Sequence, residues 1–311
     1  MQTPPNAAGS AGRLRTALPM LALVAATGFW GSSFLTVATA VQSTDPFTLV
    51  LLRFTIGMLL VLATLRSRAL RIPARTWQAG AICATAIYGG YLLNHIGLET
   101  LLSSVSGFLT ALYVPITPFL FWAISGRRPG GAAFAGALAA FAGLALLAGP
   151  GALTLSAGLG EWLTIGGAFL SALEIILMGR FAPSCDAREL AFTQLLFVAL
   201  YALVGAAIAR LSGIELTPTV VTPGLVFSIF WLAVILTCTQ LLLAWGQKFV
   251  PPAQAAVVFA LESVFAAVIG WAAGERLGLT GLAGGALIVA GIFITQAPGL
   301  IRERRRSAER R

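Results

Sequence analysis

Two glutamates within long apolar segments have the chemistry to bind and release a proton inside a membrane. Glu262 stands about nine residues into the apolar segment 253–273, which is ~14 Å deep at a helical rise of ~1.5 Å per residue. A carboxyl group at that depth can stay protonated, because a low dielectric disfavours the charged form. Glu174, in the segment 162–180, is the second candidate for proton coupling. Glu262 could instead bind an amine of the substrate or serve only as a neutral carboxyl group bonded to a neighbouring helix, and Glu174 could instead pair with Arg53.

A stripe of aromatic and polar side chains follows one face of the predicted helix 77–96. Tyr88, Tyr91 and His95 are spaced i, i+3 and i+7 and therefore share a helical face. At an offset of 149 residues Tyr91 matches Gln240, so two segments carry a polar group at similar depth. Aromatic rings with hydrogen-bonding tips suit an amphipathic solute or a cation held over the ring faces. The alternatives are an interfacial aromatic belt and, for His95, an interfacial hydrogen bond or a pH-sensing role.

Two prolines add a third feature at membrane depth. Pro115 and Pro118 free backbone carbonyls within the apolar segment 103–125. Breaks tolerated at this depth often line a cavity, which favours Tyr113 as a binding residue. The predicted substrate-binding residues are Trp30, Tyr91, His95, Tyr113, Gln240 and Glu262.

Arg53 is a third charged residue inside an apolar segment, 47–65. It stands near the outer end of that segment, where its head can snorkel to the membrane surface while its stem stays in the hydrocarbon. We therefore expect a structural role for Arg53, with an acid such as Asp45 as its partner. Glu174 is the alternative partner.

The sequence argues against the common intramembrane enzymes. His95 is the only histidine, and the patterns H-E-x-x-H, G-x-S-x-G and G-x-x-x-x-G-K-[ST] do not occur. We therefore expect no catalytic residue, metal site or cofactor. Cys83 and Cys238 lie in apolar segments and Cys185 lies between two of them, so no disulfide is expected.

The composition requires that membrane-spanning helices position these residues. Of 311 residues, 58% are apolar and only 10% are charged, and the mean hydropathy is +0.90. Soluble domains carry about 25% charged residues, and a spanning helix needs about 20 mostly apolar residues. Ten such segments occur: 18–41, 47–65, 77–96, 103–125, 131–148, 162–180, 190–210, 224–245, 253–273 and 281–297. We therefore predict an all-α membrane protein with ten transmembrane helices.

The distribution of positive charge agrees with this number of segments. Seventeen of the twenty Lys and Arg residues fall on the two tails and on alternate connections, whereas the opposite connections carry acids. Because Lys and Arg stay on the cytoplasmic side of membranes, both termini are predicted to be cytoplasmic. The basic C-terminal tail is expected to lie on anionic lipid headgroups rather than on nucleic acid.

The two halves of the chain resemble each other. A segment that begins at Ser125, SGRRPGGAAFAGALAAFAGLALL, matches one that begins at Ala273, AGERLGLTGLAGGALIVAGIFIT, at an offset of 148 residues. Of four glycines compared in the first segment, three align with a glycine in the second. Similarly, Arg53 aligns in sequence with Gln194 at an offset of 141 residues. Each half holds five segments, an odd number, so the second half must enter the membrane in the opposite sense; such inverted repeats are common in secondary transporters. The predicted organisation is a cytoplasmic tail 1–17, a first five-helix repeat 18–150, a second five-helix repeat 158–297 and a basic cytoplasmic tail 298–311.

Three motifs point to one family of proteins. They are FWGSSF from Phe29, Leu52-Arg53-Phe54, and ALESVFAAVIGWAAGERLGLTGLAGGALIVAGI from Ala260. Together they resemble EamA-type transporters of the drug/metabolite transporter superfamily. The resemblance implies ten helices and the export of a small organic solute, an amino acid or derivative or a drug-like compound, across a bacterial inner membrane. It also implies a cavity lined by the first, third and fourth segments and by the sixth, eighth and ninth.

Two positions depart from the pattern of that family. Arg127 replaces a glutamate that the second half keeps as Glu275, and Ser263 follows Glu262 where the family often has proline. Repeats and resemblance together predict a secondary transporter that works by alternating access, with proton coupling through Glu262 or Glu174. The alternatives are an uncoupled facilitator or a channel, and more remotely an intramembrane enzyme. The sequence specifies neither the solute nor the oligomeric state.

Overall fold

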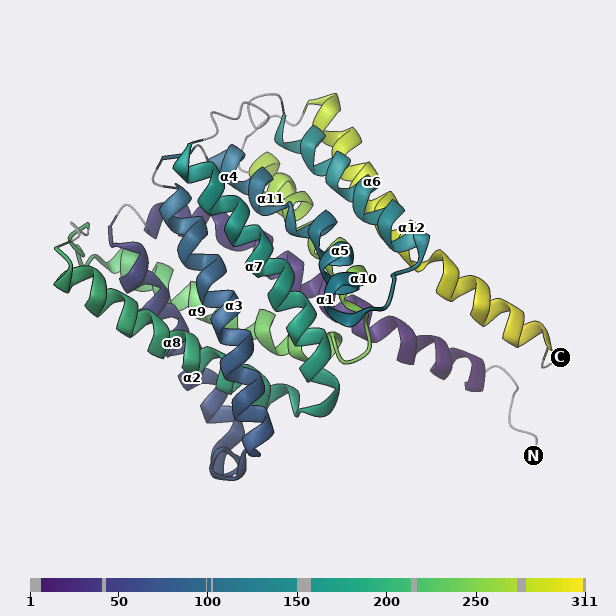
Figure 1. Cartoon of the computed structure of the whole chain (residues 1–311), viewed down its shortest axis with the longest axis horizontal. Coiled ribbons are helices and arrows are strands. Elements are labelled where there is room, and N and C mark those ends of the chain that lie inside the picture. Colours follow the sequence, from purple (N-terminus) through teal and green to yellow (C-terminus); the bar gives the residue numbers. More distant parts are fainter. Residues whose placement is uncertain are drawn as a thin grey trace.

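The computed structural model describes residues 7–40, 43–98, 100–101, 103–149, 158–213, 217–272 and 278–309. Within these residues all regular elements are helices (Figure 1). The first half contains α1 (Ala7–Ala40), α2 (Pro46–Leu65), η1 (Arg66–Arg71), α3 (Ala74–Leu98), α4 (Ser103–Thr110), α5 (Tyr113–Ser125) and α6 (Gly131–Ala148). The second half contains α7 (Leu159–Phe181), η3 (Ala182–Ser184), α8 (Ala187–Leu211), α9 (Pro223–Gly246), α10 (Pro252–Phe259), α11 (Leu261–Ala272) and α12 (Leu279–Glu309).

Local sequence signals set where several helices begin. Asp45 caps α2, where its carboxylate accepts the backbone N–H of Thr48 at 2.9 Å. Thr222 caps α9 by accepting the N–H of Leu225 at 3.1 Å. In both cases a proline follows the cap, at a position where the missing N–H costs no helical hydrogen bond. These signals account for the close agreement between the predicted segments 47–65 and 224–245 and the helices observed there.

Eight of the described helices are long and apolar enough to cross a membrane. They are Pro46–Leu65, Ser106–Ser125, Gly131–Ala148, Leu159–Ser184, Ala187–Leu211, Pro223–Gly246, Pro252–Ile269 and Leu279–Pro298. A shorter apolar stretch, Ala17–Ser33, lies within α1. The 25 residues of α3 are long enough to cross, at ~37 Å, but Arg75, Gln78 and Asn94 lower its hydropathy. The chain is therefore an all-helical, multi-pass membrane protein.

Two of the predicted segments are broken helices rather than continuous ones. The segment 103–125 divides into α4 and α5 at Ala111 and Leu112, and Pro115 explains the break, because its ring clashes with the carbonyl four residues earlier. The segment 253–273 divides into α10 and α11 at Ala260. The second break was not predicted, since it occurs without a proline; at this point Ser263 bonds the carbonyl of Ala260 in an i→i+3 pattern at 3.3 Å.

Matching helices in the two halves have matching packing partners. Helix α1 packs on α9 and α11, and correspondingly α7 packs on α3 and α5. Helix α2 packs on α8, and α6 packs on α12 (Figure 1). In each of these pairs the two helices hold the same position in their respective halves, so each helix contacts its counterpart. The main hydrophobic core includes Leu23, Val114, Phe259 and Ile288, so it draws on both halves.

Recurring glycines form the contact between α6 and α12. A Cβ atom at Gly143 would lie 2.6 Å from the carbonyl oxygen of Gly284, and one at Gly284 would lie 2.6 Å from that of Gly143. Gly136 and Gly291 face each other in the same way, at 2.5 and 2.6 Å. As numbers rise along α6 they fall along α12, so the two helices are antiparallel. Only glycine permits backbones to approach this closely.

Candidate functional site

Glu262 lies where the two broken helices meet. The Tyr113 hydroxyl group, at the start of α5, donates to Oε1 of Glu262, in the first turn of α11, at 3.3 Å. Tyr113 is buried, and α5 packs on α10 just before the second break. Both helix breaks therefore deliver a polar side chain to one place, although the two residues are 149 positions apart in sequence.

Helix α1 contacts this place from a third direction. The ring of Trp30 packs edge-on against Phe259, with 6.5 Å between centroids and 66° between planes. A Cβ atom at Gly31 would lie only 2.6 Å from the carbonyl oxygen of Glu262, so this glycine is needed for the approach of α1 to α11. We refer to Trp30, Tyr113, Phe259 and Glu262 as the Glu262 cluster. It brings together three of the predicted binding residues.

Glu174 forms a separate buried pair. Its Oε1 accepts a hydrogen bond from Nε2 of Gln194 at 3.0 Å, between α7 and α8. The amide oxygen of Gln194 has no hydrogen-bond partner among the described residues. Sequence reasoning did not predict this pair, although the match of Gln194 to Arg53 marked the position as a polar one at membrane depth.

The predictions for Arg53 were wrong about its surroundings. Its side chain is 3% exposed and does not snorkel to a surface. Its guanidinium carbon lies 5.1 Å from the ring centroid of Tyr91 and 5.5 Å from that of Phe54, and Nη2 donates to the Tyr91 hydroxyl at 3.4 Å. The two acids predicted as its partners bond elsewhere: Asp45 caps α2 and Glu174 accepts from a glutamine.

The predicted stripe on α3 faces two different neighbours. Tyr91 packs edge-on against Phe54 of α2, with ring centroids 5.7 Å apart. Tyr88 instead lies against Tyr201 of α8, with ring centroids 6.1 Å apart. His95 belongs to α3, but its side chain lies outside the described residues. The two tyrosines therefore have different ring neighbours, although both pack against the same hydrophobic cluster of α2, α3 and α8.

Gln240 is completely buried in α9, and both polar atoms of its amide group lack hydrogen-bond partners in the described part of the chain. An unsatisfied amide group at zero exposure is costly, of the order of 1–3 kcal/mol. Native proteins rarely leave such groups unpaired without a reason, such as a role in binding. Gln240 thus has the character expected of a binding residue, and no hydrogen bond described for the chain links it to the Glu262 cluster.

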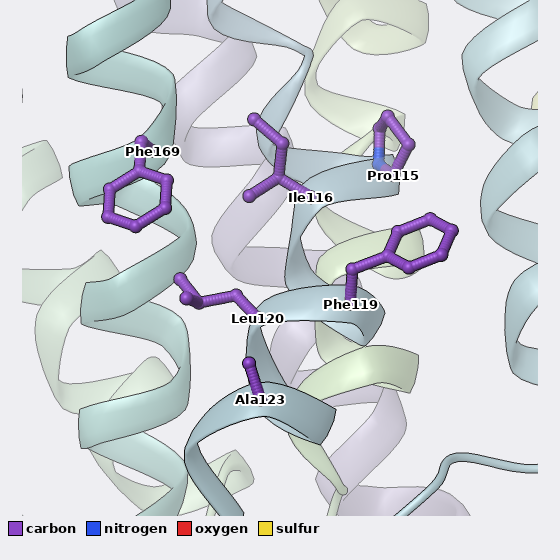
Figure 2. A pocket seen from close by; sticks show the side chains of 6 residues that line it. All are labelled: Pro115, Ile116, Phe119, Leu120, Ala123 and Phe169. Atoms are coloured by element: carbon purple, nitrogen blue, oxygen red, sulfur yellow. The ribbon is translucent and has the colours of Figure 1, made fainter.

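Two grooves formed by the described residues lie away from these polar groups. A groove with a volume of about 510 Å³ lies beside α5 and α7. Figure 2 shows that only apolar side chains line it: Pro115, Ile116, Phe119, Leu120, Ala123 and Phe169. A second, of about 400 Å³, lies between the end of α1 and the start of α9. Neither of these two grooves is lined by a predicted binding residue. Among the described residues no group of three or more His, Cys, Asp or Glu side chains could hold a metal ion.

Comparison with known proteins identifies the fold and the family. The model of the EamA-like transporter family matches residues 17–149 and 158–296. An uncharacterized transporter of Archaeoglobus fulgidus is 27% identical over 246 residues, which cover 79% of this chain and 74% of that protein. One crystal structure shares the fold, with a TM-score of 0.75 at 21% identity over 90% of this chain and 96% of the other.

The two family matches correspond to the two halves that pack reciprocally. The resemblance seen in the motifs is thereby confirmed, as is the expectation of a transporter rather than an enzyme. The chain belongs to the EamA-like transporter family and contains two EamA repeats.

Proposed function

We propose that this protein is a secondary transporter that exports a small organic metabolite, an amino acid or derivative or a drug-like solute, across a bacterial inner membrane. Membership of a transporter family supports transport. The reciprocal packing of the two halves supports alternating access, since two similar units that meet at counterpart helices can rock against each other. The outward direction rests on the resemblance to drug/metabolite transporters.

The topology proposed with this function has ten crossing helices in two inverted repeats, with both termini cytoplasmic. The antiparallel crossing of α6 and α12, which are counterparts, supports opposed orientations of the two halves. In Figure 1 the N-terminal end of α1 and the C-terminal end of α12 extend from the same side of the bundle. The distribution of Lys and Arg favours the cytoplasm for that side.

The Glu262 cluster is the proposed site of coupling. The observation that carries this proposal is the contact of Tyr113 with Glu262, because it joins the first half to the second through a titratable group. Loss or gain of one proton changes the strength of that contact and therefore the preference of the two halves for each other. Trp30, Tyr91, His95 and Gln240 remain proposed binding residues, and Glu174 is the alternative coupling residue.

Transport itself is tested with a toxicity-rescue panel. Bacteria that overproduce the protein are grown with toxic concentrations of amino acids, amino-acid analogues and drugs, and hits are followed as uptake into inside-out vesicles. We expect protection against at least one solute and its accumulation in the vesicles, relative to an empty vector. If no solute in the panel is protected against or accumulated, export of this class of solute is refuted. Equilibration without accumulation would instead indicate an uncoupled facilitator.

A further inference from the structure

We propose that Arg53 binds a carboxylate and that the exported solute therefore carries one. This inference rests on the proposed transport function. It starts from the burial of Arg53, whose side chain is 3% exposed within an apolar cluster that includes Val50, Phe54 and Leu195. A buried charge in a membrane protein normally faces a partner or a cavity, because a low dielectric penalises an isolated charge.

The contacts of Arg53 leave much of its hydrogen-bonding capacity unused. A guanidinium group has five N–H donors. The bond from Nη2 to the Tyr91 hydroxyl group is long, at 3.4 Å, and Nε has no partner in the described part of the chain. The ring faces of Phe54 and Tyr91 attract the cation, but they accept no conventional hydrogen bond from it.

A counter-ion is missing as well. Arg53 forms no ion pair with another described residue; the ion pair seen between described residues joins Arg188 to Asp186, at 3.9 Å, at the start of α8. Arg53 therefore combines a full positive charge, near-complete burial and an unpartnered donor. An anion supplied by a ligand would satisfy all three conditions.

The matching position in the second half has the opposite arrangement. Gln194, which corresponds to Arg53 at an offset of 141 residues, is neutral and has the carboxyl group of Glu174 at 3.0 Å. Where the protein supplies the carboxyl group, the matching side chain carries no charge. Where the side chain is charged, no carboxylate of the described residues pairs with it, so we assign that role to the solute.

The geometry fits a carboxylate better than a phosphate group. A guanidinium group binds a carboxylate through two parallel N–H bonds. The interactions described for Arg53 are with Phe54 and Tyr91 and include no second base, so one negative charge suffices to balance the site. Tyr91 frames the site through its ring face and its hydroxyl group.

Matched pairs of ligands test this proposal. The full-length protein in detergent is titrated with each of the natural L-amino acids and with the corresponding C-terminal amides, and binding is measured as a shift in melting temperature. Efflux of every ligand that binds is then measured in proteoliposomes. We expect shifts with some acids and at least tenfold weaker binding of their amides, because a charge-assisted bidentate pair is lost. Amides that bind and cross as well as their acids would overturn the assignment while leaving the transport function intact.

Variants separate binding from folding. Arg53→Gln should weaken the binding of acids by at least tenfold and bring acids and amides to similar affinity. Arg53→Lys keeps the charge but not the planar fork, so it should fold and bind acids with intermediate affinity. A purely structural role would lower the melting temperature without changing the ratio of acid to amide affinity. That result with the lysine variant would overturn the proposal even if the glutamine variant failed to fold.

Arg128 provides a matched control. Its guanidinium carbon lies 5.3 Å from the ring centroid of Trp122, a cation–π contact like that of Arg53, but both side chains are exposed. Arg128→Gln should leave the affinities for acids and amides unchanged. If neither acids nor amides bind, and no solute from the rescue panel is transported, both the carboxylate site and the transport function are refuted.

Discussion

Replacing Glu262 by glutamine isolates proton transfer from packing. The amide has nearly the shape of the carboxyl group and keeps an oxygen that can accept the bond from the Tyr113 hydroxyl, now 3.3 Å long. The free energy of unfolding should therefore change by no more than about 1 kcal/mol, the net contribution of one hydrogen bond. Because an amide cannot bind and release a proton in the physiological range, coupled efflux should be lost in a protein that still folds.

The expected loss follows from the energy that one proton supplies. Moving one elementary charge across about 100 mV yields about 2.3 kcal/mol, and about 1.4 kcal/mol corresponds to a tenfold concentration ratio. One proton exchanged per neutral solute thus supports a gradient of about 50-fold at this potential. The wild-type protein should reach a ratio of that order, whereas Glu262→Gln should stop near a ratio of one.

The assay uses proteoliposomes with a solute identified in the rescue panel. Net efflux against a gradient is measured over a range of pH, and counterflow exchange of labelled for unlabelled solute is measured without a proton gradient. The variant should lose the first activity and keep the second, with rates independent of pH. Glu189→Gln is the control, since Glu189 lies in the first turn of α8, away from the cluster. Proton-driven accumulation that persists in Glu262→Gln would refute coupling through this residue and shift the assignment to Glu174.

Two further predictions concern the contacts that hold the halves together. Tyr113→Phe removes only the hydroxyl group that donates to Glu262 and should slow coupled efflux several-fold, of the order expected for about 1 kcal/mol; an unchanged pH profile of efflux would contradict this role. Gly143→Leu should lower the free energy of unfolding by at least about 2 kcal/mol, because a Cβ atom there would lie 2.6 Å from the carbonyl oxygen of Gly284. Leu138→Ala, on the exposed face of α6, is its control in thermal unfolding, and equal effects of the two changes would refute the close-packing argument.

The number and bounds of most helices could be predicted because apolar length and capping residues are local properties. The predicted segment 131–148 coincides with α6, and 47–65 differs from α2 by one residue. The break at Ala260 was missed because it has no proline, so it depends on tertiary packing rather than on a local backbone restriction. The proline-induced break in the first repeat could nevertheless have predicted the break in the second, because the two breaks lie at matching positions of the repeats.

The polar site was less predictable because depth along a helix does not specify which neighbour a side chain meets. The depth of Glu262 was deduced from its position in an apolar segment, but its contact with Tyr113 depends on how α5 and α11 approach each other. For Arg53, the position along α2 suggested that its guanidinium group reaches the membrane surface. Its actual direction, toward Tyr91 on α3, depends on the packing of α2 among other helices. The different ring neighbours of Tyr88 and Tyr91 likewise depend on packing and not on their spacing along α3.

The two halves share their backbone contacts but differ in their polar groups. Gly143 and Gly284 serve the same contact from opposite sides, so a larger side chain at either position would disrupt both helices. The polar pairs do not have this constraint: Arg53 matches Gln194, and Tyr91 matches Gln240. A solute without two-fold symmetry presents different groups to the two halves, so a site formed between them needs non-equivalent residues. A carrier of an asymmetric solute therefore needs two halves that pack symmetrically but carry different polar groups. Because Arg53 and Gln194 hold matching positions but have unlike surroundings, we expect these two residues to determine which solute is selected.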